Sequence, residues 1–161
     1  MGVIMINIQI ICVGNIKEKF YIEAIEEYKK RLQAFCKLEI IELKEYKLLK
    51  ENSQEIQTAL DIEGKEIIKK IKGYSIALAI NGNSFDSVAL SKHIENLQLK
   101  GNSQLSMIIG SSYGLSNEVL NKVDEKLSFS KLTFPHQLMR VILLEQLYRC
   151  FTITKGKSYH K

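Results

Sequence analysis

The residues best suited to chemistry lie in two segments of the last third of the chain and in its C-terminal tail. The first segment runs from Ile108 to Ser116 and the second from Leu127 to Arg140. Each follows a strand-like apolar run and leads into a helix-like one, which is where open α/β sheets bind ligands. The chain closes on Ser158-Tyr159-His160-Lys161, a polar tail that places an imidazole beside the last residue. We therefore expect a site assembled from separate pieces.

Several common kinds of site are absent from the sequence. It contains neither the dinucleotide fingerprint Gly-x-Gly-x-x-Gly nor the phosphate loop that ends in Gly-Lys-Ser/Thr. The histidines at 93, 136 and 160 show no metal-ligand spacing, and no two cysteines are close together, so we expect no metal. These absences disfavour nucleotide hydrolysis and nicotinamide redox chemistry.

What remains are backbone-rich loops that carry few charged side chains. Such loops suit a ligand that is held through main-chain N–H and C=O groups and an apolar slot. S-adenosylmethionine is a ligand of this kind, because it has an adenine ring to enclose and no phosphates to neutralise. We therefore expect S-adenosylmethionine as the cofactor.

Three stretches of the chain resemble the ribosomal RNA large subunit methyltransferase H family of SPOUT methyltransferases. The run from Leu127 to Arg149, which contains Leu132-Thr133-Phe134-Pro135-His136-Gln137-Leu138-Met139-Arg140, is the most specific of the three. The terminal Tyr159-His160-Lys161 matches the family's closing Tyr-His-Lys/Arg, and Ile11 to Lys19 is similar to its N-terminus. The resemblance covers the whole chain.

This resemblance implies a fold, a reaction and partners. The fold would be one domain, residues 1–161, with a mostly parallel α/β sheet, helices on both faces and a deep C-terminal trefoil knot, an exception to the usual absence of knots. The protein would be a cytoplasmic homodimer. It would use S-adenosylmethionine to methylate N3 of a pseudouridine in a stem-loop of 23S ribosomal RNA, in the assembled ribosome.

The resemblance also implies which residues bind the cofactor. Leu78 would lie at the end of the third strand, and Gly110 would follow the Ile108-Ile109 strand. The loop around the cofactor would consist of Phe129, Ser130, Lys131, Leu132, Thr133 and Phe134.

Three positions near this site depart from the family pattern. Ser111 stands where the family usually has a second glycine, so it either strains the loop, if φ is positive there, or narrows the pocket. Ala79 and Asn83 replace an acidic residue and a lysine. A protein that kept the fold and lost methyl transfer, and so serves as an RNA-binding or ribosome-assembly protein, is the first alternative. A knotted methyltransferase that acts on transfer RNA is the second.

The tail is expected to face the substrate. The imide N3–H must lose its proton, and histidine is the side chain that titrates nearest neutral pH, so His160 would be the base or an orienting group. Tyr159 would stack on the flipped base or hydrogen-bond to it. Lys161 and Arg140 would contact RNA, although Arg140 could also bind the cofactor's carboxylate or form a surface salt bridge. A frayed terminus is the default interpretation of such a tail.

Alternating strand-like and helix-like patterns must position these residues. Strands are predicted over Ile4–Val13, Leu38–Leu43, Tyr74–Ile80, Leu105–Ile109 and Leu127–Ser130, and helices over Lys17–Cys36, Ser53–Lys72, Ser87–Leu97, Asn117–Lys126 and His136–Phe151. Ser53 is a candidate N-cap, and Asn81-Gly82-Asn83 is a predicted turn. Repeated βα units predict a mostly parallel sheet with helices on both faces.

Composition agrees with a globular domain of this class. With 45% hydrophobic and 25% charged residues, the chain is ordinary for a soluble protein, and its net charge of +5 is a modest indication of a nucleic-acid partner. No apolar run is long enough to span a membrane, and the apolar start is expected to be a strand and not a signal peptide. Cys12, Cys36 and Cys150 are expected to be buried free thiols.

Overall fold

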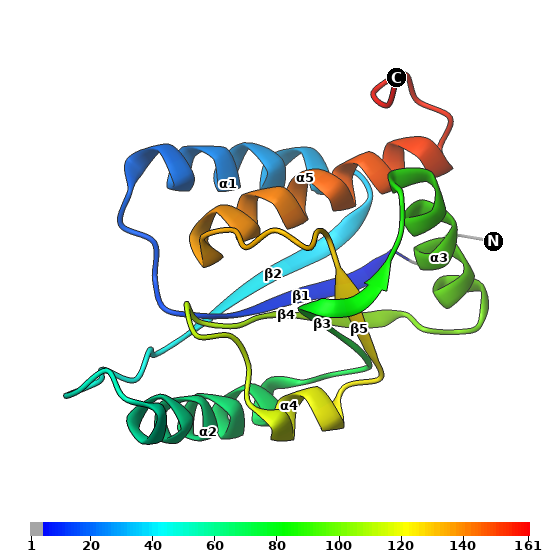
Figure 1. The fold of residues 1–161 in the computed structure, drawn as a ribbon. Coiled ribbons are helices and arrows are strands. Elements are labelled where there is room, and N and C mark those ends of the chain that lie inside the picture. Colours follow the sequence, from blue (N-terminus) through cyan, green and yellow to red (C-terminus); the bar gives the residue numbers. More distant parts are fainter. Residues whose placement is uncertain (1–4) are drawn as a thin grey trace.

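The computed structural model describes residues 5–161, in which helices and strands alternate along the chain (Figure 1). The strands are β1 (Ile6–Val13), β2 (Cys36–Leu43), β3 (Tyr74–Ser84), β4 (Gln104–Ile109) and β5 (Glu125–Ser128). The helices are α1 (Lys19–Leu32), α2 (Ser53–Lys70), α3 (Ser87–Leu99), α4 (Asn117–Lys122) and α5 (His136–Thr154). All ten predicted elements are present, and the start of the first strand, at Ile4, lies outside the described residues. The first helix is shorter than predicted, because it ends at Leu32 and Cys36 already begins β2.

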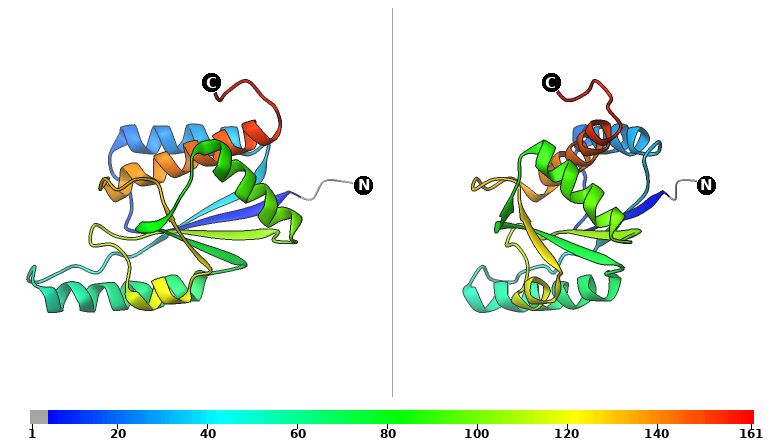
Figure 2. Two further views of the ribbon diagram at one scale, coloured as in Figure 1. Left: turned by 45° about the vertical axis from the view of Figure 1, so that its right-hand side comes forward. Right: turned by 90° about the vertical axis from the view of Figure 1, so that its right-hand side faces the viewer.

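The strands form one sheet in the order β2-β1-β4-β3-β5, and every neighbouring pair is parallel. Helices α1, α3 and α5 cover one face, and α2 and α4 cover the other (Figures 1 and 2). Each face has its own apolar core, because central strands such as β1 bury side chains on both sides. The expected parallel α/β sheet with helices on both faces is confirmed. Because all strands run the same way, their carboxyl ends share one edge.

The prediction of a turn at Asn81-Gly82-Asn83 is wrong, because strand β3 continues through these residues. After pairing with β5 as far as Leu78, β3 bulges and pairs again where Asn83 and Ser84 lie opposite Leu127 and Ser128. At Gly82 an added Cβ would lie 2.6 Å from the carbonyl carbon of Lys126. Glycine therefore serves here to let two backbones approach, and not to reverse the chain.

Several helix ends also differ from the prediction. Asn52 caps α2, because its side chain accepts a hydrogen bond from the Glu55 N–H at 2.9 Å, so Ser53 is already the first helical residue. Helix α4 ends at Lys122, four residues early, because the chain enters β5 at Glu125.

The three cysteines are buried free thiols, as predicted. Burial raises the pKa of Cys12 to about 11 and of Cys36 and Cys150 to about 12, so these thiols are protonated and unreactive at neutral pH. Between residues 5 and 161, no helix combines the length and the apolar character needed to cross a membrane.

Candidate functional site

The carboxyl ends of β3, β4 and β5 enclose a cavity of about 810 Å³. Its walls are the end of β3, the loop after β4, the loop after β5 and the first turn of α5. The lining residues are Leu78–Asn81, Ile109–Leu115, Leu120, Leu127–Ser130, Leu132–His136 and Met139. This volume is within the usual range for a cofactor or small-molecule site, about 300–1,000 Å³.

The cavity brings together most of the residues expected to bind the cofactor. Those that line it are Leu78, Gly110, Phe129, Ser130, Leu132, Thr133 and Phe134. Lys131 is absent from the lining, although both of its sequence neighbours belong to it. None of the described lining residues is an aspartate, glutamate, lysine or arginine. The cavity therefore offers mainly apolar side chains and main-chain polar groups to a ligand.

The loop after β4 folds back in a tight turn. The Ser111 carbonyl accepts a hydrogen bond from the Gly114 N–H at 2.9 Å, and the two residues form an antiparallel bridge. A Cβ on Gly110 would collide with the Gly114 carbonyl, so this turn requires glycine at position 110. Ser111 itself has no positive φ, which only glycines adopt among the described residues. The strain considered for serine at this position is thus not present.

The side chain of Ser111 is buried beside the carboxyl group of Glu63 in α2. Its hydroxyl has no hydrogen-bond partner among the described residues, yet it lies near enough to the carboxyl of Glu63 to lower the pKa of that group. Burial acts in the opposite direction and more strongly, so the net pKa of Glu63 is raised. The same carboxyl accepts the Tyr46 N–H at 3.0 Å. Ser111 therefore joins the pocket loop to α2.

The loop after β5 is ordered by its own serines. Ser128 Oγ donates to the Ser130 carbonyl at 3.1 Å, and Ser130 Oγ accepts from the Leu132 N–H at 2.9 Å. Helix α5 then starts after Pro135, and its first residue, His136, lines the cavity. Burial lowers the pKa of His136 below its ordinary value of 6.5, so this ring is neutral at neutral pH.

Arg140 does not lie where an RNA contact was expected. Its side chain is 2% exposed, and its guanidinium donates to Glu42 Oε2 at 2.6 Å and to the carbonyls of Val13 and Gly14 at 3.1 and 2.5 Å. It is also absent from the cavity lining. The geometry therefore corrects the expectation: Arg140 is a buried tie between α5 and the ends of β1 and β2, and neither a phosphate ligand nor an ordinary surface salt bridge.

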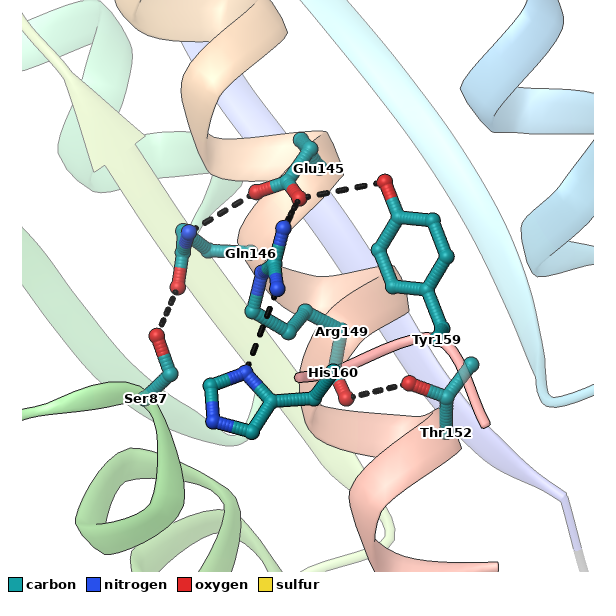
Figure 3. A network of polar contacts seen from close by, with 7 residues as sticks. All are labelled: Ser87, Glu145, Gln146, Arg149, Thr152, Tyr159 and His160. Atoms are coloured by element: carbon teal, nitrogen blue, oxygen red, sulfur yellow. Dashed lines mark hydrogen bonds and ion pairs between the residues drawn. The ribbon is translucent and has the colours of Figure 1, made fainter. Parts of the chain in front are cut away.

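The C-terminal tail is docked on the second half of α5 (Figure 3). Glu145 is the centre of this network, because its carboxylate accepts from Arg149, Gln146 and Tyr159. The Tyr159 ring also packs edge-on against Tyr148, with centroids 4.8 Å apart. The tail of this chain is thus held by specific contacts, in contrast to a frayed terminus.

The contacts of Tyr159 and His160 limit what each can do. A neighbouring Tyr28 hydroxyl, partial burial and the Glu145 carboxylate raise the pKa of Tyr159 to about 12, so its hydroxyl keeps its proton. Arg149 Nη1 lies 3.2 Å from His160 Nδ1. Because a guanidinium only donates, Nδ1 accepts, and the proton of a neutral His160 is then on Nε2.

One chain does not bring the tail and the cavity together. The cavity contacts the start of α5 as far as Met139. The tail contacts Glu145 through Tyr159 and Arg149 through His160, about 9 and 15 Å further along at 1.5 Å per residue. Figures 1 and 2 show the C-terminus at the opposite end of α5 from the loop that follows β5. Tyr159 and His160 therefore do not reach the cavity of their own chain in this arrangement.

A hydrolase-like spacing in the pocket loop has no matching geometry. Gly110-Ser111-Ser112-Tyr113-Gly114 reads Gly-x-Ser-x-Gly, the pattern of a nucleophile on a strand-to-helix turn. Here the run forms a bridged turn, and α4 does not begin until Asn117. The exposed Ser112 has no hydrogen bond to a histidine among residues 5–161. The spacing therefore reflects the shape of the turn and not a serine nucleophile.

Comparison with known proteins relates this chain to methyltransferases. The family described as "Predicted SPOUT methyltransferase" matches residues 6–160. "Ribosomal RNA large subunit methyltransferase H" of Clostridioides difficile (strain 630) is 52% identical over 158 residues, which are 96% of this chain and 99% of the relative. The protein of the same name from Clostridium novyi (strain NT) is 51% identical with the same coverage.

A solved structure supports the fold at much lower identity. "The structure of a probable methylase family protein from Haemophilus influenzae Rd KW20" matches with a TM-score of 0.54 at 13% identity, covering 96% of this chain and 70% of the other. Identity of about one half over nearly the whole length of both chains is far stronger evidence. The chain therefore belongs to the SPOUT methyltransferases, in the ribosomal RNA large subunit methyltransferase H family.

Proposed function

We propose that this protein transfers a methyl group from S-adenosylmethionine to N3 of a pseudouridine in a stem-loop of 23S ribosomal RNA, in the assembled ribosome. The observation that carries the proposal is the uncharged cavity at the carboxyl ends of β3, β4 and β5, built from the loops expected to hold the cofactor. The names of the relatives, which specify large-subunit ribosomal RNA, support the class of substrate.

The cavity fits S-adenosylmethionine in size and in chemistry. Leu78, Phe129 and Phe134 provide apolar walls for an adenine ring, and the close turn at Gly110 brings main-chain groups toward the ligand. Lys131 would contribute through its backbone, since both its neighbours line the cavity. When bound, the cofactor supplies a methyl group that its sulfonium already activates. The protein then has to align the acceptor and exclude water.

The tail would present the target base. With its proton on Nε2, His160 can donate to a carbonyl oxygen of the base and so hold N3 in line. To accept the N3 proton at Nδ1, it would first have to leave Arg149. The orienting role is therefore the one that this conformation favours, and the N3 proton would then pass to solvent water as the methyl group is transferred. Tyr159, which stays protonated, can hydrogen-bond to the base or stack on it but cannot remove its proton.

Because one chain keeps its tail away from its own cavity, we propose a cytoplasmic homodimer in which the tail of one protomer completes the cavity of the other. Mixing His160→Ala protein with Gly110→Ala protein tests this directly. A mixed dimer with shared sites contains one site without either defect, so activity returns on mixing. If each site is instead completed by the tail of its own chain, both sites of a mixed dimer carry one defect, and mixing would restore no activity. The C-terminal trefoil knot remains part of this proposal.

The reaction itself is tested by mass mapping of ribosomal RNA from cells with and without the protein. The expected result is one methyl group that disappears from a 23S pseudouridine. Calorimetry with S-adenosylmethionine separates the non-catalytic alternative, since absence of binding favours an assembly protein. Parallel assays on intact ribosomes, naked ribosomal RNA and transfer RNA separate the remaining alternative.

A further inference from the structure

A cluster of aromatic rings lies beside the docked tail. Tyr28 of α1 and Phe35, just before β2, face Tyr148 of α5 with centroid distances of 6.3 and 6.0 Å, and Phe35 stacks on Phe151 at 5.7 Å. Tyr159 of the tail joins the cluster by packing edge-on against Tyr148. The tail, α1 and α5 thus share one aromatic cluster, which lies toward the opposite end of α5 from the cavity.

Cations lie over the rings of this cluster. The guanidinium carbon of Arg31 is 5.3 Å from the Tyr28 centroid and 5.6 Å from that of Tyr148. The ammonium of Lys157 is 5.1 Å from the Phe35 centroid. Both side chains are on exposed residues, and the ring faces hold their charged groups in place. We call this surface, Arg31 and Lys157 with the rings beneath them, the basic-aromatic face.

The positive charge of this region is only partly neutralised. Arg31 donates to Glu27 through Nε alone, at 3.0 Å, which leaves its other N–H groups available. Within the part of the chain that the structure describes, Lys155, Lys157 and Lys161 form no ion pair. The unpaired lysines and the free guanidinium donors of Arg31 are therefore available to a polyanion.

We infer that the basic-aromatic face binds the phosphate backbone of RNA next to the target nucleotide. The inference rests on the proposed function and names a contact surface for it. His160, the proposed base-facing residue, is bonded to Arg149, whose guanidinium lies 4.9 Å from the Tyr159 centroid. Tyr159 packs on Tyr148, and the Tyr148 ring contacts both Arg31 and Phe35, the ring beneath Lys157. A strand that places its base at His160 would therefore pass its neighbouring phosphates near Arg31 and Lys157. Arg31 presents a planar set of donors, and Lys157 a point charge.

The test compares two charge-matched double variants. Arg31→Gln with Lys157→Gln removes the two cations while keeping long polar side chains. Lys19→Gln with Lys65→Gln removes the same charge from exposed residues of α1 and α2, which lie away from the tail contacts. Binding to large ribosomal subunits from cells that lack the protein is measured between about 50 and 200 mM salt. The methyl content of ribosomal RNA is measured in parallel.

Loss of two phosphate contacts should reduce the slope of log K against log salt by about 1.4, at about 0.7 per contact with single-stranded RNA. The control should keep the wild-type slope, and both variants should bind S-adenosylmethionine as wild type does. An unchanged slope in the first variant, or an equal change in the control, overturns the inference even if methylation is normal. A reduced slope without any methylation by the wild type supports the surface and refutes the proposed reaction.

Discussion

Replacing Arg140 with methionine should destabilise the fold and leave no direct defect in RNA binding. The change keeps an unbranched side chain in the buried site but removes the donors to the Val13 and Gly14 carbonyls. Losing charge-assisted bonds to two such acceptors costs about 1.5–3 kcal/mol each. Glu42 adds little, since its side chain is 45% exposed and regains water.

Other features of the site reduce this cost. Arg140 Nε is buried without a hydrogen-bond partner among the described residues, and removing that unsatisfied donor returns about 1 kcal/mol or more. The expected loss in free energy of unfolding is therefore about 3 kcal/mol, which corresponds to a fall in Tm of roughly 10 °C for a chain of this length.

Urea unfolding measures this loss, and Arg149→Met is the matched control. The Arg149 side chain is 25% exposed and paired within its own helix, so its loss should cost less than about 1 kcal/mol. If Arg140→Met unfolds within 1 kcal/mol of wild type and the salt dependence of RNA binding falls, Arg140 is a phosphate ligand after all. The reasoning from burial would then be refuted.

Four further changes test the pocket and its surroundings. Gly110→Ala should weaken S-adenosylmethionine binding in calorimetry at least about tenfold, because the new Cβ would meet the Gly114 carbonyl. Ser111→Gly should leave the affinity within about twofold of wild type, and a large gain in affinity would show that serine strains the loop. His136 lines the cavity, and its lowered pKa keeps the ring neutral above pH 6.5. Protonation in more acidic solution would add a positive charge to a cavity that would hold a sulfonium cofactor, so affinity should fall in wild type but not in His136→Gln. Parallel pH profiles of the two proteins would rule this out. Because its pKa is raised, Glu63 holds its proton more tightly in the folded protein than in the unfolded chain. The stability of wild type, relative to Glu63→Gln, should therefore fall as the pH rises from 4.5, the ordinary pKa of glutamate, through the raised pKa. Urea unfolding at several pH values measures this, and identical pH dependences of the two proteins would contradict it.

The alternation of helices and strands was predictable because it depends on local periodicity. Continuous apolar runs in β1 and β4 are those of strands buried on both faces, and the spaced apolar positions of α1 and α2 are those of helices. The parallel sheet follows, since strands separated by helices pair in parallel. The extension of β3 was not predictable, because Asn81-Gly82-Asn83 has the composition of a turn and only its second pairing with β5 makes it a strand.

The candidate site also has a part that the sequence predicted and a part that it did not. The family resemblance selected Gly110 and the loop from Phe129 to Phe134, and apart from Lys131 these residues line one cavity. Arg140 was misjudged, since its spacing after the loop says nothing of the β1 and β2 ends that close over it. His136 and Ser111 acquired their surroundings in the same manner, from elements far away in the sequence.

By itself, then, the sequence determined the order of elements, the loops that follow each strand and the chemical character of the tail, because these depend on neighbours within a few residues. Only the tertiary structure decided which loops form one cavity, that Arg140 is buried, and that Tyr159 and His160 dock at the far end of α5. The cavity and the burial of Arg140 depend on contacts between residues that are far apart in the sequence. The position of the tail depends on the length of α5, which separates the tail from the pocket.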